Sequence, residues 1–212
     1  MHALDSLDTW QLVALASALG WASGVRLYAV LLVTGLLGFF GWVPLPHGLA
    51  VLAHPYVLAA AGFMTFAEFF ADKIPGLDSV WDFVHTLVRI PAGAALAAAV
   101  FGGQGTPAVI AAAMLGGTLA AGSHLAKSGT RALINTSPEP FSNWTASFME
   151  DFGVGVLLWL AFAHPLAALM VVAGLVLLAA WLVPRLWRGV RRLFALAGHV
   201  RGPPAHFDGS KT

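Results

Sequence analysis

Long apolar runs are the feature that most constrains how this chain can fold. They cover residues 10–22, 27–42, 49–70, 84–101, 107–125, 152–163 and 166–183. Several are close to the about 20 residues that a helix needs to cross a bilayer. With 58% hydrophobic residues, 10% charged residues and a mean hydropathy of +0.80, the chain is too apolar for a soluble domain. The sequence therefore predicts an all-α, polytopic membrane protein with about six or seven transmembrane helices.

The predicted domain organisation is simple. Residues 1–183 form one transmembrane domain, and residues 184–212 form a basic, partly disordered tail. The first two apolar runs are interrupted by Ser23-Gly24-Val25-Arg26, and the run before this interruption is short for a crossing. Three interpretations stay open for residues 10–42: two crossings, one broken crossing, or a re-entrant hairpin whose irregular backbone is covered by protein or by a wet cavity.

Charge concentrates in the stretch from Thr65 to Arg89. Glu68 and Asp72 are four residues apart, so they share one face of a helix that Pro75-Gly76 then ends. The next helix carries a face with spacings of four, three and four, formed by Asp78, Asp82, His85 and Arg89. A membrane helix is thus expected to end in an acidic pair and to continue into an amphipathic helix.

A second polar stretch covers residues 124–151, and the tail from Arg185 is basic. Because Lys and Arg favour the cytoplasmic side, the tail is expected in the cytoplasm. Counting crossings back from it places Arg26 and both polar stretches on that same side. The turns at 42–47, 102–106 and 164 then face outward and contain no charged residue. The side of the N-terminus stays open.

The charged groups on this shared side are the candidate site. Charges at membrane depth are costly, so they should pair or line a wet cavity. The predicted ion- or substrate-binding residues are Arg26, Glu68, Asp72, Lys73, Asp78, Asp82, His85, Ser128, Gly129, Arg131, Asn135, Glu150 and Asp151. The alternative is that such groups are solvated loop charges. For Asp78, Lys127 and Glu139, a role in the site and a solvated loop position both stay open. Glu150 also fits a capping box with Ser147.

A weak internal repeat accompanies these charges. Ser23-Gly24-Val25-Arg26 recurs as Ser128-Gly129-Thr130-Arg131, and an acidic pair follows each segment. Repeats with glycine-broken helices are typical of transporters. A half-helix opening at Ser-Gly would direct backbone N–H groups at an anion, and the arginine would reinforce this. The alternatives are a chance match and a role of Ser-Gly in tight packing.

Composition excludes several classes of function. The absence of cysteine excludes thiol catalysis and disulfides, and no HExxH, GxSxG or P-loop motif is present, so an enzyme is not favoured and no cofactor is expected. A net charge of +1 gives no sign of nucleic-acid binding. Three hypotheses remain: an ion-coupled secondary transporter or flippase for a small or lipid-linked ionic solute, a membrane scaffold or assembly factor, and, less favoured, a lipid-modifying enzyme. The expected partners are membrane lipids, a small ionic solute and a second copy of the chain in a homo-oligomer.

Three segments carry a family resemblance: SGVRLYA, FAEFFADKIPGLDSVWDFVHTLVR and SGTRALINTSPEPFSN. They resemble the small bacterial integral membrane proteins labelled domain of unknown function 4126, over nearly the whole chain except the tail. The resemblance implies a multi-pass protein of the bacterial inner membrane with no established activity. A shorter segment, Glu68–Lys73, is similar to the E-x-G-D-K-T motif of a cation/proton exchanger family, with one more residue between the acids and Ile74 in the place of Thr.

Overall fold

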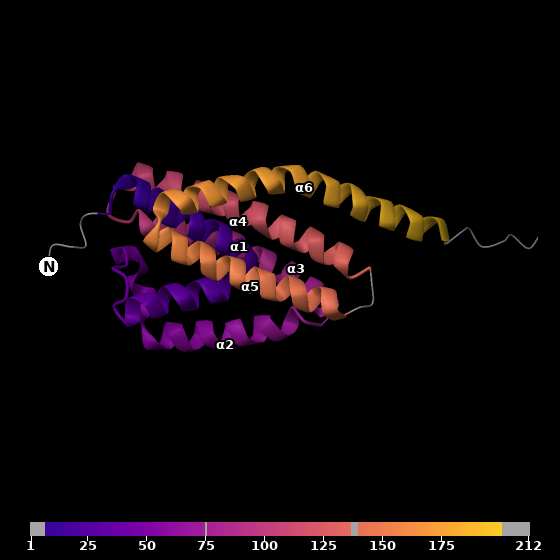
Figure 1. The fold of residues 1–212 in the computed structure, drawn as a ribbon, viewed down its shortest axis with the longest axis horizontal. Helices are drawn as coiled ribbons and strands as arrows, with labels where there is room; N and C mark the ends of the chain where they lie inside the picture. Colours follow the sequence, from indigo (N-terminus) through magenta and orange to yellow (C-terminus); the bar gives the residue numbers. More distant parts are fainter. Residues whose placement is uncertain (1–6, 75, 137–139, 201–212) are drawn as a thin grey trace, which may run out of the picture.

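The computed structural model describes residues 7–74, 76–136 and 140–200. All regular secondary structure in these ranges is helical, which confirms the predicted fold class. The elements are α1 (Thr9–Phe39), the 3-10 helix η1 (His47–Ala53), α2 (Pro55–Ala71), α3 (Leu77–Val100), α4 (Thr106–Ile134), α5 (Pro140–Ala163) and α6 (Pro165–Val200). The helices lie side by side in an elongated bundle, with α6 extending beyond one end (Figure 1).

Most of these helices are long and apolar enough to cross a membrane. Five pass this test in the described residues: Thr9–Phe39, Leu77–Val100, Thr106–Ile134, Phe141–Ala163 and Pro165–Gly189. A sixth candidate is the pair formed by η1 and α2, which is bent by 70°. The chain is therefore a multi-pass membrane protein. α6 continues without a break across residue 183, where the sequence predicts the end of the domain.

The first helix, α1, is a hairpin whose two arms are joined at Arg26. The backbone leaves helical geometry at this residue, with φ −144° and ψ 71°. A straight helix of 31 residues would separate its ends by roughly 46 Å. Instead Leu7 and Gln11, before and at the start of α1, line the same cavity as Val43 and Pro44, which follow its end. The chain therefore reverses direction, and both arms lead to the same end of the bundle (Figure 1).

Each arm of this hairpin, residues 9–25 and 27–39, has fewer than the about 20 residues of a full crossing. Its tip contacts the middle of α5 and Asp72 at the end of α2. Of the three interpretations that the sequence leaves open, two crossings and a re-entrant hairpin both have this reversal of direction, whereas one broken crossing does not. The structure also places the start of α1 at the same end of the bundle as residues 42–47. The sequence leaves the side of the N-terminus open.

Glycines bring the first arm of the hairpin against α4. A Cβ added to Gly20 would lie 2.7 Å from the Cα atom of Gly116, and one added to Gly24 would lie 2.2 Å from the carbonyl oxygen of Ala120. Helices in lipid approach closely where such small residues meet. This contact fixes the position of Arg26 relative to α4.

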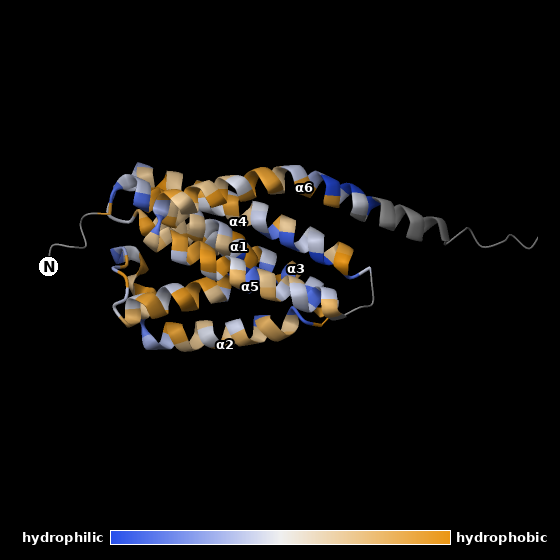
Figure 2. Cartoon of the chain, in the orientation of Figure 1, coloured by the Kyte–Doolittle hydropathy of each residue, from blue (hydrophilic) through white to orange (hydrophobic). Residues whose placement is uncertain are grey.

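The bundle buries charge and exposes apolar side chains. On α3 the predicted charged face is buried, whereas Phe83 and Leu87 on the other face are 80% and 83% exposed. This is the reverse of an amphipathic helix in water, because the surroundings of α3 are hydrocarbon. Hydrophilic residues on α4 and α6 concentrate toward the end of the bundle from which α6 extends (Figure 2).

Candidate functional site

A set of ion-paired side chains lies inside the bundle around the tip of the hairpin. We call it the charge network. It joins residues of α1, the end of α2, α3, α4 and α5: the bases Arg26, Arg89, Lys127 and Arg131, and the acids Glu68, Asp72, Asp82, Glu150 and Asp151. The side chains of all four bases are at most 2% exposed.

Arg26 fastens the tip of the hairpin to two other helices. Its Nη1 lies 2.6 Å from Asp72 Oδ2, at the end of α2. Its Nε lies 2.9 Å from Asp151 Oδ1 and 3.6 Å from Glu150 Oε2, on α5. Its Nη2 donates hydrogen bonds to the hydroxyl of Ser147, at 2.8 Å, and to the carbonyl oxygen of the same residue, at 3.2 Å. Breaking these contacts would free the tip from both α2 and α5.

Asp72 is the acid that links most of the bases. Besides Arg26, its Oδ2 contacts Lys127 Nζ at 2.9 Å and Arg131 Nη2 at 3.9 Å. Burial disfavours the charged carboxylate, but the cations of Lys127 and Arg26 outweigh this effect, so the pKa of Asp72 lies below its ordinary value. Asp72 therefore stays ionised. The neighbouring Lys73 lies at the edge of the network.

Lys73 is held by aromatic rings rather than by the acids. Its Nζ lies 3.0 Å from the ring centroid of Phe69 and 4.8 Å from that of Phe148. These cation–π contacts connect the end of α2 with α5. Burial and the nearby charge of Arg26 lower the pKa of Lys73.

Arg89 bridges two helices at the deeper end of the network. Its Nη2 pairs with Glu68 Oε1 on α2, and its Nη1 lies 2.5 Å from Asp82 Oδ1 on α3. All three side chains are at most 2% exposed. Within the described residues, Glu68 Oε2 and Asp82 Oδ2 accept no hydrogen bond.

His124 lies between Arg89 and two hydroxyl groups. Its Nδ1 lies 3.3 Å from Arg89 Nη1, and its Nε2 lies 2.7 Å from the hydroxyl of Thr86 and 3.4 Å from that of Ser128. An arginine can only donate, so Nδ1 accepts and a neutral ring carries its hydrogen on Nε2. In this form Nε2 cannot take a proton from either hydroxyl.

Arg131 extends the network to the predicted residues Asp78 and Asn135. It contacts Glu150 at 3.0 Å and donates to the backbone and side-chain oxygens of Asn143, each at 3.1 Å. Asn143 donates to the side-chain oxygen of Asn135 at 2.7 Å, and Asn135 donates to the two oxygens of Asp78 at 2.8 and 3.0 Å. Asp78 is therefore buried, and both of its carboxylate oxygens accept hydrogen bonds.

Three other predicted residues lie beside the network. His85 stacks on Trp81 and its Nδ1 lies 2.8 Å from the carbonyl oxygen of that residue, so it packs within α3. Gly129 faces the side chain of Leu186 on α6. The helix α4 is continuous through Ser128-Gly129, so the helix opening expected there is wrong, because the neighbouring residues keep helical hydrogen bonding.

Two further interpretations are also wrong. Asp78 and Lys127 are buried, which contradicts the alternative in which they are solvated loop charges. Ser147 and Glu150 lie well inside α5, which begins at Pro140, so they form no capping box. Glu139 lies outside the described residues. The predicted site residues did not include Arg89, Lys127, Asn143 and Ser147. Arg89 nevertheless belongs to the predicted charged face of α3, and Lys127 stands four residues before Arg131 on the same helix face.

The network contains more acids than buried bases. Counting Asp78, the described residues contribute six carboxylates and, with Lys73 at the edge, five bases; without Lys73 and Asp151, whose side chain is 36% exposed, five carboxylates face four buried bases. Excess charge in a medium of low dielectric is costly unless a cation neutralises it. No group of three or more potential ligands in the described part of the chain is arranged to hold a metal ion. The arrangement can instead accept a proton or an organic cation.

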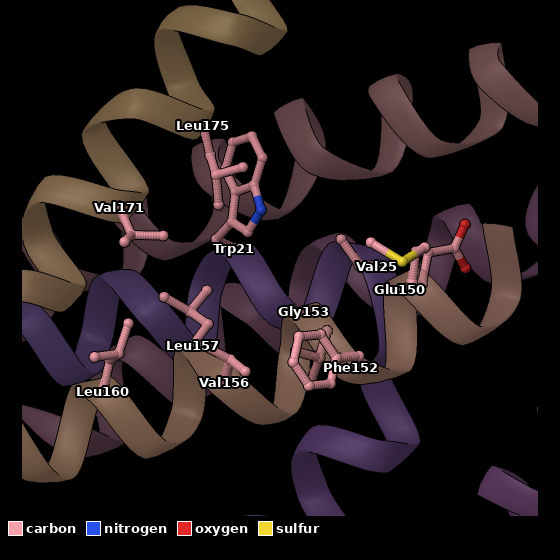
Figure 3. Close-up of a pocket in the computed structure, with 12 residues that line it drawn as sticks. Trp21, Val25, Glu150, Phe152, Gly153, Val156, Leu157, Leu160, Val171 and Leu175 are labelled. Atoms are coloured by element: carbon pink, nitrogen blue, oxygen red, sulfur yellow. The ribbon is translucent and has the colours of Figure 1, made fainter. Parts of the chain in front are cut away.

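Two adjoining cavities, of about 290 Å³ and about 390 Å³, lie beside the network. Both are lined by Trp21 and Val25 of α1, Met149 and Glu150 of α5, and Leu175 of α6. Figure 3 shows Glu150 at one end of the smaller cavity and apolar side chains of α1, α5 and α6 along the rest. A ligand here would contact mostly hydrocarbon, together with Glu150 in both cavities and with Lys127, Ser123 and Thr130 in the larger one.

Comparison with known proteins identifies a family. Neither the curated proteins nor the solved structures contain a match to the chain. A family model described as "Domain of unknown function (DUF4126)" matches residues 13–185. This range contains both arms of the hairpin and every member of the charge network. The chain therefore belongs to the DUF4126 family.

Proposed function

We propose that this protein is an ion-coupled secondary transporter or flippase for a small or lipid-linked ionic solute. The observation that carries the proposal is the charge network at the tip of the α1 hairpin, where one more carboxylate than bases lies inside the bundle. Charged residues inside a membrane domain are costly and usually serve ion or substrate pathways. Broken helices near the centre of the bundle are typical of such transporters.

The proposed coupling group is Glu68. Its pair with Arg89 connects α2 to α3, and its second carboxylate oxygen accepts no hydrogen bond within the described residues. Protonation of Glu68 would remove the charge that holds Arg89 and would leave Asp82 as the only acid paired with it in the described structure. Proton binding would thereby bias α2 and α3 toward a different arrangement.

The proposed moving element is the hairpin tip. Arg26 ties it to Asp72 at the end of α2 and to Asp151 on α5. A cation that neutralises one of these acids weakens the tie, so ligand binding and movement of the tip are coupled. The second candidate function, a scaffold, is favoured by the extension of α6, where Trp187, Arg188 and Arg191 are exposed.

The distribution of basic residues supports an orientation. All described Lys and Arg residues belong to the network, to its edge or to α6 beyond Val183. The end of the bundle that contains the turns after α1, α3 and α5 carries none in the described residues. The positive-inside tendency supports a bacterial inner membrane location with the C-terminus in the cytoplasm.

Proton movement in proteoliposomes tests the function. Vesicles containing the protein and a trapped pH-sensitive dye are exposed to gradients of H⁺, Na⁺ and K⁺, with and without ionic amphiphiles in the bilayer. We expect gradient-dependent proton movement that Glu68→Gln abolishes. Asp8→Asn, at the opposite end of the bundle, is the matched control and should behave as the wild type. Wild-type flux in Glu68→Gln would remove Glu68 from the mechanism, and no proton movement under any gradient would contradict coupling.

Co-purification separates the two candidate functions. The scaffold hypothesis predicts that a partner protein is retained by the full chain and lost when residues 186–212 are removed. The transport hypothesis predicts that proteoliposomes of the purified chain move protons without any partner. Size-exclusion profiles of each variant in detergent show whether the fold is retained.

A further inference from the structure

We infer that the outer face of α6, where this helix leaves the bundle, binds the headgroup of an anionic phospholipid. Five exposed residues form this surface, which we call the α6 strip: Trp181, Arg185, Trp187, Arg188 and Arg191. The inference goes beyond the proposed function, because the strip lies outside the charge network and would bind lipid whether or not the protein moves an ion. Nothing in the family description assigns a ligand to it.

The arginines of the strip face away from the bundle. Arg185, Arg188 and Arg191 recur every three residues, so they follow one side of the helix. All three are exposed. On the other side, Leu186 is buried and lies beside Gly129 of α4, which seats this part of α6 on the bundle. The strip is therefore open to the lipid or solvent that surrounds the protein.

No acidic side chain neutralises the strip in the described structure. None of the ion pairs among the described residues includes Arg185, Arg188 or Arg191, whereas each of the four buried bases pairs with an acid. The sequence explains this difference, because no Asp or Glu occurs between Asp151 and Asp208. The positive charge of the strip is thus available to an anion from outside the chain.

Two of the arginines reach back along α6 toward its apolar part. Arg185 Nη1 donates to the carbonyl oxygen of Trp181 at 2.6 Å, and Arg185 Cζ lies 3.8 Å from the ring centroid of the same residue. Arg188 Nε donates to the carbonyl oxygen of Pro184 at 3.2 Å. Each hydrogen bond uses one of the five N–H donors of a guanidinium, so both groups keep donors for an anion at this level.

The position of the strip along α6 corresponds to the depth of lipid headgroups. Arg185 follows Pro165, the first residue of α6, by 20 residues. A helix covers this interval in roughly 30 Å, which is the thickness of the hydrocarbon core. The residues from there to Arg191 cross the headgroup layer. Exposed tryptophans such as Trp187 are typical of the same layer.

A phosphodiester is the anion that fits these groups. A guanidinium can hold phosphate through two parallel N–H···O bonds, and an anionic phospholipid presents its phosphate at this depth. Trp181 and Trp187 would then contact the glycerol and the first methylenes of the lipid. Phosphatidylcholine also carries a phosphate, but its own quaternary ammonium offsets the attraction. Each arginine near an anionic lipid surface strengthens binding by roughly fivefold.

Tryptophan quenching in the full chain tests the strip. Phosphatidylglycerol and phosphatidylcholine with identical chains, brominated near the glycerol, are titrated into the protein in maltoside micelles. Subtracting the signal of a Trp181→Phe/Trp187→Phe double variant isolates quenching at the strip. We expect phosphatidylglycerol to quench at a concentration about tenfold or more below that of phosphatidylcholine, since three arginines contribute. Inorganic phosphate at the same concentration as the lipid should not compete.

Two double variants that each remove two positive charges provide the matched control. Arg188→Gln/Arg191→Gln should reduce the preference for phosphatidylglycerol to about twofold or less. Arg201→Gln/Lys211→Gln changes the tail instead and should keep the preference of the wild type. Because Arg188 and Arg191 are exposed, the first variant should also keep the fold, which its size-exclusion profile checks.

Four results would overturn the inference. Equal quenching by the two lipids, or an unchanged preference in Arg188→Gln/Arg191→Gln, would show that the strip does not bind the headgroup. An equal loss in the tail variant would show diffuse attraction by net charge, and competition by inorganic phosphate would show an anion site independent of lipid. If the lipids are equivalent while a partner protein is retained by the wild type and lost in Arg188→Gln/Arg191→Gln, the strip is a protein-binding surface.

Discussion

Two segments of this chain share the pattern Ser-Gly-x-Arg and yet fold differently. In residues 23–26 the helix breaks, and Arg26 adopts φ −144° and ψ 71° at the tip of a hairpin. Residues 128–131 lie inside the continuous helix α4. Both segments nevertheless deliver an arginine to the charge network. The shared pattern thus corresponds to the placement of an arginine and not to a helix break.

The neighbours of the two glycines show why the outcomes differ. Gly24 presses on the backbone of α4, where an added Cβ would lie 2.2 Å from the carbonyl oxygen of Ala120. Gly129 faces the flexible side chain of Leu186 at 3.1 Å. The first segment is therefore held by backbone contact and by acids on two helices, whereas the second keeps the regular hydrogen bonds of α4. Tertiary contacts, rather than local preference, determine where the helix breaks.

The largest effect is expected from removing the arginines themselves. Arg26→Met and Arg131→Met should each destabilise the protein by about 3–5 kcal/mol, because each leaves buried carboxylates without a partner. Hydrogen exchange should distinguish them. Arg26→Met should increase exchange in residues 23–30, whereas Arg131→Met should leave the amides of residues 126–134 protected. Equal exchange at both segments would contradict the view that only the first is held by its arginine.

An intermediate effect is expected from adding one methyl group to each glycine. Gly24→Ala should destabilise by about 1–3 kcal/mol, since α1 and α4 must move apart. Gly129→Ala should be nearly neutral, because Leu186 can adjust and alanine favours the helix by about 1 kcal/mol. Thermal unfolding in detergent measures both. A larger loss for Gly129→Ala would reverse the comparison.

The smallest effect is expected from lowering the pH. The group concerned is the carboxylate of Asp72, which contacts both Arg26 and Arg131. The pKa of Asp72 is lower in the folded protein than its ordinary value, so its stabilising effect is present at neutral pH and is lost only as the pH falls through that lowered pKa. The difference in melting temperature between wild type and Asp72→Asn should therefore stay constant through mild acid and shrink only in strong acid. A difference that grows as the pH falls would contradict the lowered pKa.

Local periodicity made much of α3 predictable. Spacings of four, three and four place Asp78, Asp82, His85 and Arg89 on one face, and all four are buried. Helix geometry alone determines this, because the residues belong to a single helix. The apolar runs likewise predict the spanning helices, since the length needed to cross a bilayer is fixed.

Contacts between helices were not predictable in the same way. Asn143 and Ser147 enter the network only because α5 lies at one particular height beside α4 and the hairpin tip. The sequence contains no signal for that relative height. The choice of a hairpin at Arg26 depends similarly on Gly24 meeting Ala120, which is nearly a hundred positions further along the chain. Long-range packing therefore decided the parts of the site that the sequence left open.

The hairpin also has a consequence for the order of events during synthesis. Arg26 enters the membrane early, but Ser147 is 121 positions further along and the acids of α5 follow it. Until α5 leaves the ribosome, Arg26 lacks three of its four partner residues: Ser147, Glu150 and Asp151. In a nascent chain stopped before α5, Asp72 would be the one acid left to pair with Arg26 among those that contact it in the described structure, and Lys127 and Arg131 would compete for it. The contacts of Arg26 in the first helix are therefore completed only when the fifth helix, α5, is in place.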